Sequence, residues 1–321
     1  MKAAVIDGYG GSDKLTVREV PDPGPPPTGQ VLVQVRATSV NPVDWKIRRG
    51  SLRLVMPASF PLILGFDAAG EVVEIGPEVT RFQPGDPVFG AIDTRRTGGA
   101  YAELALAHES ALAPLPASLS IEEAAALPLA GLTALQALRD QGELVEGEKA
   151  AINGGSGGVG HFAVQIARAM GAHVTAVASG RNQQFLRDLG AHETINYEED
   201  YVDSADDFWD VLLDAAGTLS FRDAEPSLAD DGGVYVTTNA GPAAFGWSFL
   251  TALRGLVGPR KRARAVMVKY KAEDLLHLGR LADQGRVRPE IQEVFPLEKI
   301  RQAHDLSEAG RVRGKLVVRI E

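Results

Sequence analysis

The sequence predicts an α/β protein with two domains, one rich in β-strands and the other built on a doubly wound parallel sheet. The length of 321 residues leaves room for two domains at about 150 residues each. The early part of the chain shows short strand-like segments between Gly/Pro turns, and the later part alternates strands with helices.

The early segments are rich in β-branched and apolar residues and are bounded by turn residues, which is typical of an all-β unit. We expect strands over Lys2–Ile6, Leu15–Val20, Val31–Ala37, Ala69–Ile75, Pro87–Ile92 and Tyr101–Ala107. Alanine- and leucine-rich stretches then predict helices over Ile121–Leu127 and Ala130–Gln141.

From Ala150 onward, strands and helices alternate at the spacing of parallel βαβ units. The expected strands are Ala150–Asn153, His173–Ala178, Val211–Ala215 and Val234–Thr238, and the expected helices are Val159–Met170, Gln183–Leu189 and Leu219–Leu228. An amphipathic helix around Leu275–Leu281, a helix over Ile300–Leu306 and a strand over Leu316–Ile320 follow. We expect that strand to return to the first domain, so residues 1–120 and 266–321 form one domain and 121–265 the other.

Charge and composition narrow the functional classes. Lysine plus arginine number 33 against 42 aspartate plus glutamate, a net charge of −9, and this field repels nucleic acids and anionic membranes. The chain has no cysteine, which excludes disulfides, thiolate zinc sites and cysteine nucleophiles. The first apolar run is too short for a signal peptide, and no stretch is long enough to span a bilayer. We therefore expect a cytoplasmic protein with neither a nucleic-acid nor a membrane partner.

The strongest local motif is the glycine-rich segment 151–160, between a predicted strand and a predicted helix. Gly155, Gly157 and Gly160 fit the G-x-G-x-x-G spacing of dinucleotide-binding loops. Such a loop allows the backbone to approach a diphosphate, which the N–H groups and partial positive charge of the helix N-terminus then stabilise. We expect the cofactor to contact Gly155, Ser156, Gly157, Gly158, Val159 and Gly160; a glycine-rich turn without a ligand is the alternative.

The residues after the next strand indicate which dinucleotide is bound. NAD enzymes place a carboxylate there for the ribose hydroxyls, but in this sequence no carboxylate follows until Asp188. Ser179 and Arg181 instead suit a 2′-phosphate, which predicts NADPH. A solvated arginine at the start of a helix is the alternative reading of Arg181.

Five motifs in order carry a family resemblance over nearly the whole chain: segments 41–46, 65–73 and 129–134, the glycine loop, and segment 310–315. With these motifs the chain resembles the medium-chain dehydrogenase/reductase superfamily and, within it, the zinc-independent NADPH:quinone oxidoreductases of the zeta-crystallin-like branch. The resemblance implies a GroES-like β-rich catalytic domain, an inserted Rossmann domain and a homodimer.

Zinc-dependent relatives carry a cysteine ligand near Pro42–Asp44 and a Gly-His-Glu where this chain has Gly65-Phe66-Asp67. Phe66 cannot bind a metal, and the six histidines form no compact ligand set, so we expect no metal site. Without a Lewis acid, an unactivated ketone lacks polarisation, whereas a quinone or enone spreads the incoming charge over a conjugated system. The expected reaction is hydride transfer from NADPH to a small quinone or α,β-unsaturated carbonyl substrate.

The resemblance also assigns candidate site residues. It implies that Asn41 faces the substrate oxygen and that Lys46 contacts the cofactor or the enolate, although Asn-Pro is itself a turn signal and Lys46 lies among other basic residues. It places Thr133 against the nicotinamide and Tyr197 near the adenosine phosphate. Asn239 follows a strand at the carboxyl edge of the sheet, where ligands bind in such folds.

Two other functions remain possible. The same scaffold could reduce enoyl thioesters, or it could bind NADPH without turnover as a structural or interaction protein.

The basic run 260–264 predicts a solvated loop, because the wide basic surface and stacking aromatics of a nucleic-acid site are missing around it.

Overall fold

The computed structural model describes residues 1–92, 98–199, 208–239, 241–254 and 261–321, which form two compact units. The first unit comprises Met1–Ala130, Tyr270–Gly285 and Pro289–Glu321, and the second comprises Gly131–Lys269 and Arg286–Arg288. The two-domain α/β architecture is confirmed. The domain boundaries near residues 120 and 265 stay a prediction, and the compact units divide a little further along the chain.

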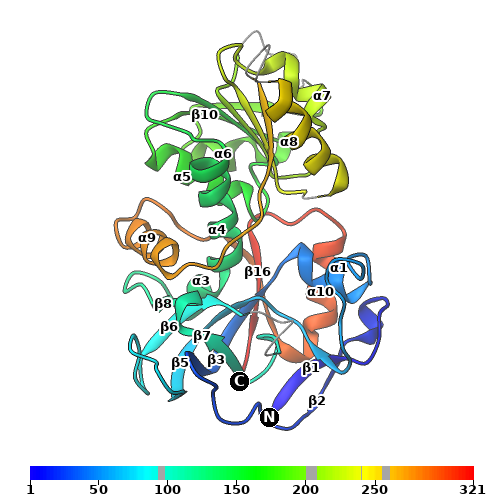
Figure 1. Ribbon diagram of the computed structural model, residues 1–321, viewed down its shortest axis with the longest axis vertical. Helices are drawn as coiled ribbons and strands as arrows, with labels where there is room; N and C mark the ends of the chain where they lie inside the picture. The colour runs from blue at the N-terminus through cyan, green and yellow to red at the C-terminus, as the bar shows by residue number, and fades with distance from the viewer. Residues whose placement is uncertain (93–97, 200–207, 240, 255–260) are drawn as a thin grey trace. The chain divides into compact units, whose positions relative to one another are not determined.

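The first unit is built on two sheets (Figure 1). The smaller has the order β2-β1-β4, from Thr16–Glu19, Lys2–Ile6 and Leu62–Ile63. The larger, seven-stranded sheet has the order β15-β16-β3-β5-β6-β8, with β7 also paired to β3. Its strands are β3 (Gln30–Val40), β5 (Asp67–Ile75), β6 (Pro87–Ala91), β7 (Leu104–His108), β8 (Leu112–Pro114), β15 (Ile291–Pro296) and β16 (Lys315–Arg319).

The C-terminal strand returns to the first unit, as predicted. In β16, Leu316, Val317 and Val318 are all buried, and this apolar run pairs antiparallel with β3. The register places Leu316 opposite Val40. Lys315, which precedes Leu316, therefore lies beside Asn41, which follows Val40. This pairing positions the polar cluster described below.

The described part of the first unit also contains helices α1 (Pro42–Arg48), α3 (Ile121–Ala126), α9 (Ala272–Asp283) and α10 (Ile300–Glu308). Helix α1 begins with Pro42. Proline is favoured at this position, because a backbone N–H in the first turn of a helix has no hydrogen-bond partner within the helix. Helix α3 begins with a capping box, in which Ser120 and Glu123 accept each other's backbone N–H groups. It packs against β3, β5 and β16, which is why residues 121–130 belong to the first unit.

The second unit holds a six-stranded sheet of order β11-β10-β9-β12-β13-β14, with every pairing parallel. Its strands are β9 (Lys149–Asn153), β10 (His173–Ala178), β11 (Glu193–Asn196), β12 (Val211–Asp214), β13 (Val234–Thr237) and β14 (Arg262–Ala265). The helices are α4 (Pro128–Gln136), which begins in the first unit, its π-helical extension η3 (Ala137–Gln141), α5 (Gly160–Ala169), α6 (Gln183–Asp188), α7 (Phe221–Ala224) and α8 (Pro242–Arg254). The doubly wound parallel sheet is therefore confirmed.

Two local predictions for the second unit were wrong. The helix expected over Leu219–Leu228 ends at Ala224 and tightens into the 3₁₀ turn η5 (Glu225–Ser227), which contains a proline. The basic run does not form a loop over its described part, because Arg262–Ala265 pairs as β14 with β13. Arg260 lies outside the described residues. Short 3₁₀ turns also occur as η1 (Ser12–Lys14), η2 (Glu109–Ala111), η4 (Gly180–Asn182) and η6 (Leu297–Lys299).

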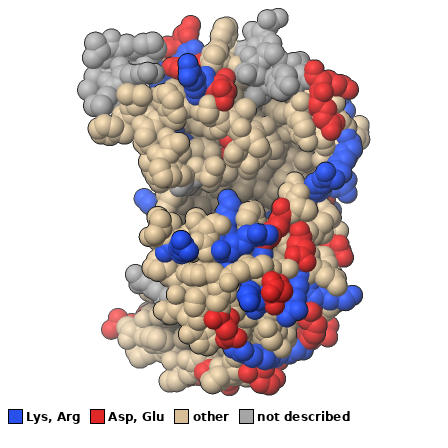
Figure 2. All heavy atoms as spheres, turned by 90° about the vertical axis from the view of Figure 1, so that its right-hand side faces the viewer, with Lys and Arg blue, Asp and Glu red and all other residues tan. Residues whose placement is uncertain are grey.

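The surface carries both signs of charge. Figure 2 shows Lys and Arg interspersed with Asp and Glu over the lower part of the drawn face, which belongs to the first unit. Among the described helices, none combines the length and the apolar character that crossing a bilayer would require.

Candidate cofactor and substrate sites

The glycine loop connects the carboxyl end of β9 to the N-terminus of α5, as the motif predicts. Gly154 has a φ of 78°, in the region that favours glycine. A Cβ added to Gly160 would lie 2.0 Å from the carbonyl oxygen of Gly154, so the helix can approach the strand this closely only with glycine there. A Cβ on Gly157 would meet only that same oxygen, at 3.4 Å. Gly160 is therefore packed too closely against Gly154 to carry a side chain, whereas Gly157 has room for one.

The two serines expected near the cofactor lie on either side of one asparagine. The side-chain N–H₂ of Asn182 donates to Ser156 Oγ and to Ser179 Oγ, each at 3.2 Å. Ser179 follows β10, so this contact joins the glycine loop to the end of the neighbouring strand. Asn182 was not among the predicted site residues, because an asparagine at a helix start usually indicates only a cap.

The end of β10 also holds a carboxylate that the sequence analysis did not place there. The backbone N–H of Gly180 donates to Glu198 Oε2 at 3.0 Å. Parallel pairing of β10 with β11 brings the segment after β11 to this position, and Tyr197 N–H bonds the carbonyl oxygen of Ala178 at 3.2 Å. Arg181 is exposed, and the side chain of Tyr197 is about half exposed. The segment expected to bind the 2′-phosphate therefore lies beside the carboxylate of Glu198 as well as next to Arg181.

At the carboxyl end of β12, Asp214 organises the following loop. This buried carboxylate accepts from Asn153 Nδ2 at 2.8 Å and from the backbone N–H of Gly217 at 2.9 Å. Tyr235 donates its hydroxyl to the same carboxylate at 3.2 Å, and burial raises the pKa of that tyrosine. Asp214 was not predicted to be a site residue, although an aspartate at the end of a predicted strand is a signal that the sequence contains.

Asn239 lies at the same carboxyl edge, as predicted. Its side chain is exposed, and its backbone N–H donates to Thr237 Oγ1 at 3.1 Å. Asn239 lines a cavity of about 200 Å³ together with apolar side chains that include Phe221 and Trp247, whose ring centroids are 5.4 Å apart. The carboxyl edge of this sheet thus offers polar and aromatic groups to a ligand.

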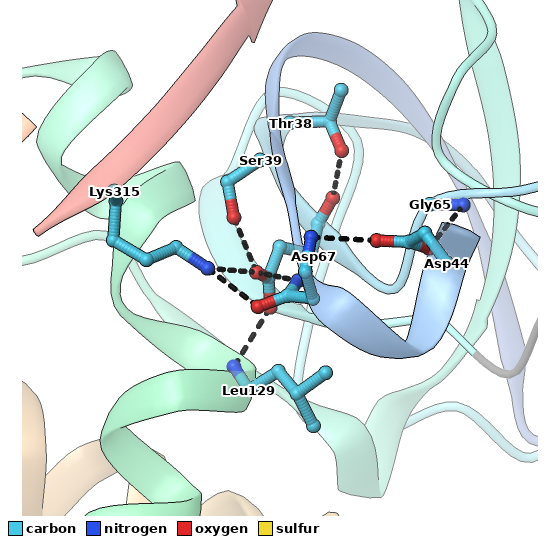
Figure 3. A network of polar contacts seen from close by, with 8 residues as sticks. Thr38, Ser39, Asp44, Gly65, Asp67, Leu129 and Lys315 are labelled. Carbon is cyan, nitrogen blue, oxygen red and sulfur yellow. Dashed lines mark hydrogen bonds and ion pairs between the residues drawn. The ribbon is translucent and has the colours of Figure 1, made fainter. Parts of the chain in front are cut away.

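The first unit contains a buried polar cluster around Asp67 (Figure 3). Asp67 Oδ2 accepts from Asn41 Nδ2 at 2.7 Å and from the hydroxyl of Ser39, and it lies 3.4 Å from Lys315 Nζ. Asp67 Oδ1 accepts from the backbone N–H of Leu129 at 2.7 Å. Lys315 Nζ also donates to Asn41 Oδ1 at 2.5 Å. Asn41, predicted to be a site residue, is thus held by a cation and an anion that the sequence analysis did not connect with it.

A second buried group lies beside this cluster. Asp44 accepts from the backbone N–H groups of Asn41 at 2.8 Å and Gly65 at 3.1 Å, and the hydroxyl of Tyr101 also bonds its carboxyl group. Burial raises the pKa of Asp44 to about 7. The Tyr101 hydroxyl lies 3.2 Å from His304 Nε2, and burial lowers the pKa of His304 to about 3. Asp44 therefore changes its charge near neutral pH, while His304 stays neutral there.

The remaining candidates are Lys46 and Thr133. Lys46 lies on α1 in the first unit, with Nζ 5.7 Å from the centre of the Trp45 ring. Thr133 lies on α4 in the second unit and is buried. Asn41 and Lys46 thus belong to the first unit, and the expected cofactor residues, Thr133 included, to the second.

The residues in the position of the zinc site of metal-dependent relatives do not fit zinc. Phe66 is buried and has no donor atom, and the carboxylate of Asp67 is already bonded to Asn41, Ser39 and Leu129 beside the Lys315 ammonium. Within the described ranges, no three His, Asp or Glu side chains are grouped as metal ligands would be. The whole sequence lacks cysteine.

Comparisons with known proteins agree with this architecture. A family model for the alcohol dehydrogenase GroES-like domain matches residues 27–117, and one for zinc-binding dehydrogenases matches residues 189–318. The chain is 38% identical over 328 residues to the chloroplast envelope quinone oxidoreductase homolog of Arabidopsis thaliana, covering 99% of this chain and 98% of the relative. It is 32% identical over 308 residues to the trans-enoyl reductase pgmF of Aspergillus terreus, covering 91% of this chain and 86% of the relative.

A solved structure, the quinone oxidoreductase from Coxiella burnetii, superposes with a TM-score of 0.89 at 34% identity, covering 100% of this chain and 99% of that chain. The fold and the family models define an oxidoreductase with a GroES-like domain and a domain that binds a nicotinamide cofactor. Within that class, the chain belongs to the quinone oxidoreductase family of the medium-chain dehydrogenases/reductases.

Proposed function

We propose that the protein uses NADPH to reduce a small quinone or α,β-unsaturated carbonyl compound without a metal ion. The observation that carries this proposal is that segment 65–67 offers no metal ligand, because Phe66 has no donor atom and the Asp67 carboxylate is paired with Lys315. Lacking a Lewis acid there, the protein depends on hydrogen-bond donors to stabilise charge on the substrate oxygen. A conjugated acceptor suits such a site, because it delocalises the charge that arrives with the hydride.

NADPH, when bound, supplies a hydride to the conjugated acceptor. A reduced quinone then takes a proton from solvent on oxygen, and an enone that has received the hydride at its β-carbon takes a proton from solvent on its α-carbon. We assign Asn41 as the donor to the substrate oxygen, since one N–H of its amide is bonded to Asp67 and the other has no partner among the described residues. Lys46, in the last turn of the helix that Asn41 caps, is the second candidate to contact the cofactor or the enolate. The products are NADP⁺ and a hydroquinone or saturated carbonyl compound.

The glycine loop and its neighbours are proposed to hold the cofactor. The N-terminus of α5 and the backbone of residues 155–160 suit the diphosphate, while Ser179, Arg181 and Tyr197 suit the adenosine 2′-phosphate. Thr133 and Asn239 are assigned to the nicotinamide end. The negative charge of Glu198 repels a 2′-phosphate. We therefore expect the preference for NADPH over NADH to be smaller than it would be if Arg181 were the only charged residue there.

We further propose a homodimer located in the cytoplasm. Strand β14 is the last strand in the order of the six-stranded sheet, and a second copy of the chain could pair with such an edge. Analytical ultracentrifugation tests the dimer, and subcellular fractionation of the native host tests the location. A monomer at micromolar concentration, or recovery in an organelle fraction, would contradict these two assignments.

A panel of acceptors tests the reaction. The purified protein, treated with EDTA, is mixed with NADPH or NADH and with 9,10-phenanthrenequinone, 1,4-benzoquinone, a short enone or an enoyl thioester, and loss of cofactor absorbance is followed. We expect faster turnover with NADPH and with quinones or enones. Turnover confined to the enoyl thioester would favour the reaction named for the Aspergillus terreus relative. NADPH binding with no turnover across the panel would favour a non-catalytic protein.

A further inference from the structure

Lys315 is a charged side chain in a place where charge is costly. It begins β16, is 2% exposed, and faces the equally buried Asp67. Burial lowers the pKa of Lys315, and the nearby carboxylates of Asp67 and Asp44 raise it again. Since buried ion pairs often stabilise a fold less than apolar side chains of similar size, the pair calls for an explanation other than stability.

The contacts of Asn41 explain the presence of this buried ion pair. Its amide oxygen accepts from Lys315 Nζ at 2.5 Å, and its amide nitrogen donates to Asp67 Oδ2 at 2.7 Å. A cation at the oxygen and an anion at the nitrogen permit only one of the two amide orientations. The cation at the oxygen also draws electron density away from the amide nitrogen, which makes the second N–H a stronger donor.

The cluster around this amide is itself held in place. Asp67 is held by the Ser39 hydroxyl and the backbone N–H of Leu129, so its carboxylate cannot rotate without losing both bonds. Lys315 is held by the pairing of β16 with β3, which sets it beside Asn41 although the two are 274 residues apart in sequence. Figure 3 shows the lysine side chain extended toward Asp67. A donor fixed before the substrate arrives needs no reorganisation during the reaction.

We infer that Lys315 and Asp67 are positioning residues, which orient and polarise the Asn41 amide so that its remaining N–H stabilises the negative charge developing on the substrate oxygen. This inference rests on the proposed function. Lys315 acts through Asn41, so its contribution exists only while the amide is present. The expected effect is on kcat rather than on the KM for NADPH, because the glycine loop lies in the other unit.

A double-mutant cycle tests the coupling. Lys315→Met keeps the length of the side chain and removes the charge, and we expect it to lower kcat about 10-fold or more while the KM for NADPH changes less than about twofold. In an Asn41→Ala background, the same substitution should change kcat less than about twofold. Losses that multiply in the double variant would overturn the inference.

The substitution leaves Asp67 without its counter-ion and could weaken folding, so stability is measured on every variant. If Lys315→Met does not fold, Lys315→Met combined with Asp67→Asn restores neutrality in nearly the same shape, and we expect this pair to fold with the same loss of kcat. Lys299→Met, at an exposed lysine of the same unit, is the matched control and should leave kcat unchanged. A neutral pair that folds and retains the wild-type kcat would also overturn the inference.

The two proposals fail in different ways. If the wild-type protein reduces none of the acceptors, the proposed function fails and the role of Lys315 fails with it. If the wild type is active but the losses multiply, only the positioning role is wrong.

Discussion

The backbone N–H of Gly180 donates to the carboxylate of Glu198 at 3.0 Å, at the end of strand β10 where the adenosine ribose of a dinucleotide binds in such folds. A carboxylate in this place favours the free hydroxyls of NADH and repels the 2′-phosphate of NADPH. Arg181, next to Gly180 in the chain, acts in the opposite direction. Cofactor preference is therefore expected to result from a competition between these two side chains.

The first prediction concerns the substitution of Glu198, the acidic residue of this pair. Glu198→Gln keeps an oxygen that can accept from Gly180 and removes the negative charge. We expect the Kd for NADPH to fall about fivefold, because one repulsive charge interaction near the protein surface contributes about 1 kcal/mol. The Kd for NADH should stay the same or rise. Fluorescence titration with each cofactor measures both.

Glu199→Gln is the matched control, since Glu199 is the exposed neighbour whose side chain has no bond to Gly180. It should change neither Kd by more than about twofold. Equal changes for NADPH and NADH in Glu198→Gln would show that Glu198 does not lie near the 2′-position.

The second prediction concerns Arg181. Arg181→Ala should weaken NADPH binding about 10-fold or more and NADH binding less than about twofold, because only NADPH carries the phosphate that the guanidinium would pair with. Arg187→Ala, at another exposed arginine nearby on α6, is the control and should leave both Kd values unchanged. A similar loss for both cofactors in Arg181→Ala would refute the 2′-phosphate assignment.

The third prediction separates folding from cofactor binding in the glycine loop. Gly160→Ala places a Cβ 2.0 Å from the carbonyl oxygen of Gly154, so we expect it to lower the free energy of unfolding by roughly 1–3 kcal/mol. Gly157→Ala has only an ordinary 3.4 Å contact with that oxygen and should keep the wild-type Tm. Its methyl group would nevertheless occupy the approach of the diphosphate, and we expect NADPH binding to weaken about 10-fold. Wild-type NADPH affinity in Gly157→Ala would contradict the proposal that the glycine loop binds the diphosphate.

The fourth prediction concerns the pH dependence of stability. Because the pKa of Asp44 is raised from 3.8 to about 7, its stabilising contribution is complete below pH about 4 and is lost as the pH rises to about 7. The pKa of His304 is lowered from 6.5 to about 3, so its contribution is present above pH about 6.5 and is lost as the pH falls toward 3. Between about pH 4 and pH 6.5, a rise in pH therefore reduces the contribution of Asp44 to stability and increases that of His304.

Asp44→Asn should remove the decline toward pH 7 and leave the rise that His304 produces. The change of about three pKa units corresponds to at most about 4 kcal/mol in the free energy of unfolding. Urea unfolding at a series of pH values measures this quantity, with the exposed Asp231→Asn as the control. A variant whose pH profile parallels that of the wild type would show that Asp44 does not titrate near neutral pH.

The sequence by itself determined the features that depend on neighbouring residues. The alternation of strands and helices, the glycine loop before α5 and the return of the C-terminal strand were all predictable, because apolar periodicity and turn chemistry act over a few residues. Strand β14 was not predictable, since a run of basic residues forms a strand only when a sheet edge such as β13 is available to pair with it.

Tertiary structure alone decided which charges meet. Lys315 reaches Asn41 across 274 residues through the register of β16 on β3, and Glu198 reaches Gly180 because β10 and β11 lie side by side. Sequence distance had made Asp188 the first carboxylate after β10, but electrostatic interactions depend on separation in space. The local pattern therefore located the glycine loop, and the pairing of distant strands determined which charged and polar groups meet within each unit.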